Sequence, residues 1–307
     1  MAGAKQFKTY EQQLGLLERR GMAIKDPTAA LQFLHAVSYY RLSGYWHPMR
    51  RFDSETGQSL DVFRSGASFD LVRDLYRFDA RLRHAVSGEL AAVELAVRAL
   101  LGHELGRIDP FIHLDADLLG APARQEVGKR GETRHQIWLR KYEGALASSR
   151  EDFVAHHKRK YDARLPIWAA VEVMDWGMLS HLYAMSPGPA RNPVAGACAL
   201  RPPQLESWLR SLNIVRNYSA HHARMFNRVF DIKPRLSDDP RLGVVKGQEN
   251  RVFTQLTLIQ YLHRELGLSP ATELPVLLRE FPANDIVPFS RLGAPNGWEK
   301  AELWTIS

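Results

Sequence analysis

Hydrophobic residues recur every three or four positions through most of this chain, a spacing that predicts amphipathic helices. The longest such run starts after Ser68, a residue type that caps helices, and keeps its period to Leu105. At about 1.5 Å per residue this helix would span roughly 55 Å. It should form a central helix onto which the others pack. No stretch carries a convincing strand pattern, so we predict an all-α fold.

Shorter helices are expected before the central one. Thr9 and Gln12 form a capping box that opens the first. Asp26-Pro27 pairs an N-cap residue with a proline suited to the first helical position, and it opens a second helix that Ser43-Gly44 should end. Residues 51–67 are rich in polar residues and glycine, which indicates a loop.

Further helices, a loop and a tail are expected between the central helix and the end of the chain. In order, we expect a helical region at 132–161, a buried helix from Pro166 to Leu182, a proline-rich loop from Pro187 to Pro193, a helix after Pro202-Pro203, an amphipathic helix at 251–266, a short helix starting at Ser269-Pro270, and an irregular tail anchored by Trp298 and Trp304. We therefore predict a helical domain at 1–235 and a helical extension at 236–307 packed on it.

The helix expected after Pro203 has an unusual polar face. Its apolar side runs from Leu205 to Phe226 and includes His222, which we expect to be packed. The opposite stripe contains only amides, an imidazole and guanidiniums: Arg210, Asn213, Asn217, His221, Arg224 and Arg228. No acid occurs between Glu206 and Asp231. A face without counter-charges is suited to an anion, and phosphate fits best.

Composition narrows the class of protein. The 307 residues carry a net charge of +7, which suits a nucleic-acid partner but is also found in ordinary basic proteins. Cys198 is the only cysteine, which excludes an intrachain disulfide and a cysteine zinc site. The start of the chain has no apolar signal segment, and no apolar run is long enough to cross a membrane. We expect a cytoplasmic protein that does not associate with membranes.

The stretch from Ser211 to Arg228 contains the spacing Arg216-x4-His221, which fits RNA cleavage. RNA supplies its own nucleophile, the 2′-OH, so the protein must move protons and stabilise a phosphorane. A histidine can move the protons, and an arginine can hold two phosphate oxygens in a bidentate fork. Asn217, one turn before His221, can orient the imidazole or contact phosphate. This chemistry requires no metal ion and no cofactor.

Four blocks, in this order, resemble a known family: Tyr39-Tyr-Arg-Leu-Ser-Gly-Tyr-Trp-His-Pro48, Pro166-Ile-Trp-Ala-Ala-Val-Glu-Val-Met-Asp-Trp-Gly-Met-Leu-Ser180, Arg216-Asn-x-x-Ala-His-His-x-Arg224 with Asn227-Arg228, and Leu292-Gly-Ala-Pro-Asn-Gly-Trp298 with Trp304. The chain resembles Abi-like proteins, the AbiD/AbiF group of phage-defence proteins. The resemblance implies a HEPN-type helical bundle, whose R-x(4-6)-H motif is a ribonuclease site.

The resemblance also implies activity and partners. We expect a metal-independent endoribonuclease of an abortive-infection or toxin-like system, with Arg216, Asn217 and His221 as catalytic residues. RNA would be the substrate, and a small structured RNA is a natural partner for a chain similar to AbiF. The residues expected to bind RNA are Arg210, Arg224, Asn227, Arg228, Lys158, Arg159 and Lys160.

Helix geometry bears on how the motif would act. Five residues apart on a straight helix, Arg216 and His221 diverge by about 140° around the axis. Either the helix bends between them, or two copies of the motif meet across a two-fold axis. The resemblance implies the second arrangement, a homodimer.

Other interpretations of the same residues remain open. Arg216 could pair with Glu172 or Asp175, and His221 could make a hydrogen bond in the core. The run Lys158–Lys160 also fits a solvated helix end. At the level of function, the alternatives are a non-catalytic RNA-binding module that holds a small structured RNA, and a helical scaffold or antitoxin partner without RNA affinity.

Overall fold

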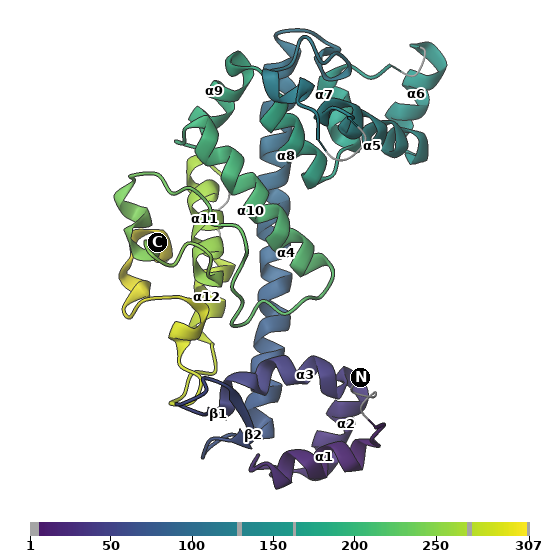
Figure 1. Cartoon of the computed structure of the whole chain (residues 1–307). Coiled ribbons are helices and arrows are strands. Elements are labelled where there is room, and N and C mark those ends of the chain that lie inside the picture. The colour runs from purple at the N-terminus through teal and green to yellow at the C-terminus, as the bar shows by residue number, and fades with distance from the viewer. Residues whose placement is uncertain (1–5, 128–130, 162–163, 269–271, 306–307) are drawn as a thin grey trace.

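The computed structural model describes residues 6–127, 131–161, 164–268 and 272–305, and it confirms the all-α prediction. The central helix α4, Phe69–Gly106, runs the length of the molecule (Figure 1). Ser68 caps it by accepting a hydrogen bond from the backbone N–H of Leu71. Its buried positions include Leu75, Leu82 and Val93, which follow the helical period predicted from the sequence.

One end of α4 is covered by the N-terminal elements, which are α1 (Tyr10–Arg19), α2 (Pro27–Val37), α3 (Tyr39–Trp46) and the strands β1 (Arg50–Phe52) and β2 (Ser59–Phe63). The capping box of Thr9 and Gln12 is confirmed. The prediction of a single helix from Asp26-Pro27 to Ser43-Gly44 was wrong. Ser38 adopts a left-handed φ of 67°, which ends α2, and its side chain caps α3.

The polar loop predicted at 51–67 was also wrong in part. Residues 50–63 form an antiparallel hairpin in which Arg50 lies opposite Phe63. The strands are short. In β2, Leu60 and Val62 alternate with polar residues over only four positions, and both are exposed, so the strand signal is weak.

The other end of α4 carries α5 (Arg134–Ser148), α6 (Asp152–Lys160), α7 (Ile167–Ala170), the 3-10 helix η4 (Val171–Val173), α8 (Trp176–Met185) and α9 (Gly188–Ala197). The helix predicted from Pro166 to Leu182 is interrupted at Met174, because Asp175 starts α8 by accepting from the backbone N–H of Met178. The loop predicted at 187–193 is instead the first part of α9, with Pro193 inside the helix.

The motif helix α10, Pro202–Ala220, packs against α4, α8 and α9. It ends at Ala220, so the expectation of one helix through Arg228 was wrong. His221 is its C-cap, and His222 and Asn227 have left-handed φ values of 55° and 53°. The residues after Ala220 form a loop that returns toward α3.

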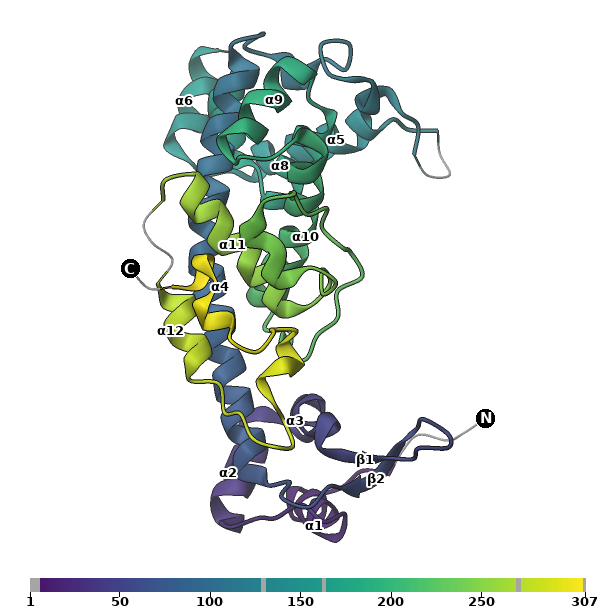
Figure 2. The same cartoon turned by 90° about the vertical axis from the view of Figure 1, so that its left-hand side faces the viewer.

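The C-terminal helices α11 (Val252–Glu265) and α12 (Glu273–Arg279) lie along α4 (Figure 2). We predicted an amphipathic helix at 251–266, but α11 is buried on nearly all sides. The tail is anchored as predicted, with Trp298 and Trp304 buried against Phe253. The predicted helix start at Ser269-Pro270 lies outside the described residues, and the division at residue 235 stays a prediction.

Candidate functional site

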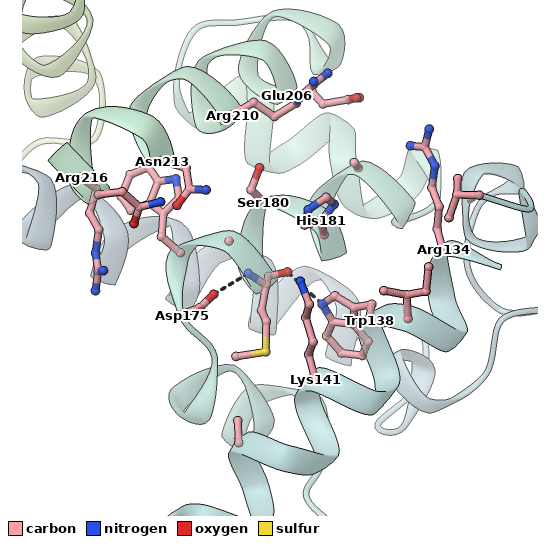
Figure 3. Close-up of a pocket in the computed structure, with 18 residues that line it drawn as sticks. Arg134, Trp138, Lys141, Asp175, Ser180, His181, Glu206, Arg210, Asn213 and Arg216 are labelled. Atoms are coloured by element: carbon pink, nitrogen blue, oxygen red, sulfur yellow. Dashed lines mark hydrogen bonds between the residues drawn. The ribbon is translucent and has the colours of Figure 1, made fainter. Parts of the chain in front are cut away.

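A cleft of about 800 Å³ opens between α5, α8 and α10 (Figure 3). Two indoles hold its walls together. Trp138 of α5 donates to the carbonyl of Met178 in α8 at 3.0 Å, and Trp176 of α8 donates to the carbonyl of Leu209 in α10 at 2.8 Å. Both rings are buried. The three helices are therefore fixed relative to one another, and the cleft between them is preformed.

Besides Glu206, the α10 wall of the cleft consists of Arg210, Asn213, Arg216 and Asn217. These positions are three, six and seven residues apart, so the helical period places them on one face. The core-facing side of the same helix buries Leu205, Trp208, Leu212 and Val215. Predicted site residues Arg216, Asn217 and Arg210 thus line one cavity.

The opposite side of the cleft carries Arg134 and Lys141 of α5, with Ser180 and His181 of α8 between the two walls (Figure 3). Sequence reasoning did not select any of these residues. The only available signal was that the block from Pro166 to Ser180, one of the family-like stretches, ends at this position. Arg134 and Lys141 are more than sixty positions from α10 along the chain, so only packing brings them together.

The charge in the cleft is predominantly positive. Its two carboxylates already have partners: Asp175 caps α8 at 2.7 Å from the Met178 N–H, and Glu206 pairs with Arg191 at 2.6 Å. Within the described residues, no ion pair involves the four cations that line the cleft, Arg134, Lys141, Arg210 and Arg216.

The structure does not place Arg216 in an ion pair with Glu172 or Asp175 among the described residues. Glu172 instead lies 3.5 Å from Arg98. Arg216 does act at longer range on Glu94: burial raises the pKa of that carboxyl, and Arg98 and Arg216 oppose the rise. The guanidinium of Arg216 therefore retains its hydrogen-bonding capacity for a ligand in the cleft.

His221 is exposed and does not line the cleft. It sits at the C-cap of α10, where its backbone N–H donates to the carbonyl of Asn217. α10 continues past Arg216 and ends at Ala220, one residue before His221. One chain consequently presents the arginine and Asn217 inside the cleft and the imidazole outside it.

Buried Asp79 of α4 determines the course of the loop after α10. Its carboxylate accepts from the Tyr45 hydroxyl at 2.6 Å, from the Phe226 N–H at 2.6 Å, from the Met225 N–H, and from the Arg83 guanidinium. Burial raises the pKa of Asp79, and the Arg83 charge opposes the rise. Since all four partners are donors, the ionised carboxylate fits this site. Arg83 is buried with it.

Two of the arginines expected to bind RNA are engaged by the protein itself. Arg224 donates to the carbonyl of Phe226 at 2.7 Å and passes so close to α3 that a Cβ at Gly44 would lie 2.8 Å from its Nε. Arg228 donates to the Tyr218 hydroxyl and stacks on that ring, with 4.9 Å from Cζ to the centroid. Burial lowers the pKa of Arg224. Their contact with RNA, and that of Asn227, stays a prediction.

The remaining predicted residues lie outside the cleft. Lys158, Arg159 and Lys160 are exposed on the last turn of α6, where Lys158 donates to the carbonyl of Leu146. His222 is exposed, so the expectation that it packs in the core was wrong. The reason is the end of α10, which removes His222 from the helical stripe. Its carbonyl accepts from the Arg41 guanidinium.

A model of the family described as Abi-like protein matches residues 32–227. The chain belongs to the Abi-like protein family. No curated protein and no solved structure matches it. The matched Abi-like region begins in α2 and ends in the loop after α10, so it contains every wall of the cleft, Asp79, and the R-x4-H motif.

Two further observations concern the same Abi-like chain. In the part of the chain that the structure describes, no group of three or more histidine, cysteine, aspartate or glutamate side chains is arranged to hold a metal ion. Among those residues, no helix is both long and apolar enough to span a bilayer.

Proposed function

We propose that this Abi-like protein is a HEPN-type endoribonuclease that cleaves RNA without a metal ion, in the context of abortive-infection defence suggested by its family. The observation that carries the proposal is the wall that α10 contributes to the cleft, whose one acid, Glu206, is already paired with Arg191. It presents Arg210, Asn213, Arg216 and Asn217 to one cleft, and its guanidiniums have no ion-pair partner among the described residues. Such a wall is suited to the phosphates of RNA.

Each motif residue has a role in this reaction. The 2′-OH of RNA attacks the adjacent phosphorus, and the bond to the 5′-oxygen breaks, which leaves a 2′,3′-cyclic phosphate and a 5′-OH. Arg216 holds the two non-bridging oxygens as negative charge builds on them. His221 moves protons between the attacking and leaving oxygens. Asn217 contributes a hydrogen bond to the phosphate from the same wall as Arg216.

The position of His221 favours a site shared by two chains. Arg216 lines the cleft, whereas His221 is exposed at the helix end. A second copy related by a two-fold axis can present its own His221 to the first copy's Arg216. We therefore propose a homodimer as the active species, with RNA as substrate.

The test is RNA cleavage by the purified protein in EDTA. We expect cleavage to persist, with products carrying a 2′,3′-cyclic phosphate and a 5′-OH, because the mechanism uses an imidazole and a guanidinium alone. His221→Ala should abolish cleavage and leave RNA affinity mostly intact. Activity that requires Mg²⁺, or products with a 5′-phosphate, would refute the mechanism.

The exposure of His221 also supports a second candidate function, a non-catalytic module that holds a small structured RNA. The same basic cleft would bind RNA, and His221 would have no chemical role. The two candidates agree on affinity and differ on cleavage. RNA that stays intact with wild-type protein, at concentrations where it is fully bound, would favour the binding module.

A further inference from the structure

His181 shares the cleft with three cations, on a part of the site that the R-x4-H motif does not reach. Arg134 and Lys141 line the cleft from α5 and Arg210 lines it from α10, while His181 itself projects from α8 (Figure 3). The three helices are tied together by the hydrogen bonds of Trp138 and Trp176. The packing of these helices fixes the backbone positions of the four basic residues, of which Lys141, His181 and Arg210 are exposed.

The charges facing His181 are unbalanced. The acids near it are Asp175 and Glu206, which are engaged by the α8 N-terminus and by Arg191, respectively. Burial, Lys141, Arg134 and Arg210 lower the pKa of His181, and Asp175 opposes this only in part. An anion placed among these groups would relieve repulsion between them and gain up to four donors.

We propose that Arg134, Lys141, His181 and Arg210 form a phosphate-binding subsite in the cleft. The phosphate belongs to RNA if the proposed function holds, and the subsite then grips the strand away from the bond that is cut. Arg210 and Arg216 are six residues, about 9 Å, apart along α10, so the strand is held at two points. His181 is a positioning residue in this arrangement and acts on substrate binding.

Removing one cation of the subsite should change the salt dependence of RNA binding. Each phosphate contact contributes about −0.7 to the slope of log affinity against log salt for a single strand. Lys141→Gln should therefore flatten the slope by about 0.7. Arg140→Gln is the matched control, since Arg140 precedes Lys141 on α5, pairs with Glu132 at 2.6 Å and does not line the cleft. The slope for Arg140→Gln should change by less than half as much as the slope for Lys141→Gln.

The measurement uses the full chain with His221→Ala as background and a labelled oligouridylate as probe. This background prevents cleavage during titration and removes the titration of His221. Because a bound phosphate stabilises the imidazolium, the pKa of His181 should rise in the complex, and RNA affinity should increase as pH falls through it. His181→Gln should lose most of that pH dependence.

A second readout is the imidazole C2–H resonance of His181 in the same protein. Oligouridylate should shift this resonance and raise the apparent pKa of His181. A titration with inorganic pyrophosphate shows whether a free phosphate compound produces the same response. A response to pyrophosphate alone would assign the subsite to small phosphate compounds. No response to either probe, with unchanged salt slopes in Lys141→Gln and Arg134→Gln, would overturn the subsite.

Failure of this inference and failure of the proposed function give different results. Cleavage by wild type with an unaltered slope in Lys141→Gln removes the subsite and leaves the ribonuclease. A flattened slope with no cleavage by wild type removes the ribonuclease and leaves the subsite. In an active enzyme, His181→Gln should raise KM several-fold with little change in kcat, and an equal loss in kcat would contradict a positioning role.

Discussion

At the scale of single residues, Asp79 connects the long helix to the motif loop. It is fully buried on α4 and accepts from Tyr45 of α3 and from the backbone N–H groups of Met225 and Phe226. Gly44 acts in the same region by leaving room for the side chain of Arg224. The loop after α10 is thus held by two elements that precede it by more than a hundred residues.

Asp79→Asn tests this anchor. The amide offers one acceptor oxygen and adds a donor that faces other donors, and it leaves the Arg83 charge buried without a counter-ion. We expect a loss of about 3–5 kcal/mol in the free energy of unfolding, the cost of breaking a buried ion pair. The measurement is urea unfolding followed by circular dichroism. Asp74→Asn, on the exposed side of the same helix, should change stability by under about 0.5 kcal/mol.

At the scale of elements, the break before α8 shapes the mouth of the cleft. Asp175 ends the preceding 3-10 segment and caps α8, so Trp176 turns inward to reach the Leu209 carbonyl. A continuous helix would present different side chains to α10. The same carboxylate is one of only two acids lining the cleft, considering the described residues.

Asp175→Ala and Asp175→Ser separate the contribution of Asp175 as the cap of α8 from its contribution as a negative charge in the cleft. Alanine cannot cap, so we expect a loss of about 1 kcal/mol in stability, whereas serine caps α8 and should keep most of it. Both variants remove a negative charge from the cleft and should bind RNA more tightly. Thermal unfolding and fluorescence anisotropy with labelled RNA measure the two effects. Weaker RNA binding by the serine variant would contradict the placement of RNA in this cleft.

At the scale of the whole molecule, the long helix separates the N-terminal elements from the α5–α9 end, and α10 crosses between them. The cleft is lined by α5, α8 and α10, while His221 lies where α10 ends and the Asp79-bound loop begins. This arrangement motivates the proposed shared site in a dimer.

Mixing two inactive variants tests the sharing. Arg216→Ala and His221→Ala homodimers should each be inactive, because every cleft lacks the same group. If Arg216 of one chain works with His221 of its partner, a mixed dimer contains one whole cleft, and cleavage should return on mixing after subunit exchange. An enforced monomer that cleaves RNA as fast as the dimer would exclude a shared site.

The sequence by itself determined the features that depend on local pattern. The period and the Ser68 cap fixed α4, the capping box fixed the start of α1, and the spacing along α10 placed Arg210, Asn213 and Asn217 on one face. These features require only neighbours within a few residues, because helical period and capping are local properties.

Only the tertiary structure decided where α10 stops and what faces it. The helical spacing of the sequence continued to Arg228. In the structure the backbone N–H of Phe226 instead donates to Asp79, 147 positions away along the chain, so the loop is not helical there. The opposing wall, with Lys141 and His181, likewise comes from helices that the sequence does not connect to the motif. Long-range hydrogen bonds and packing outweigh local helical preference at these positions, because a buried carboxylate without donors costs more than the turns of helix that are lost.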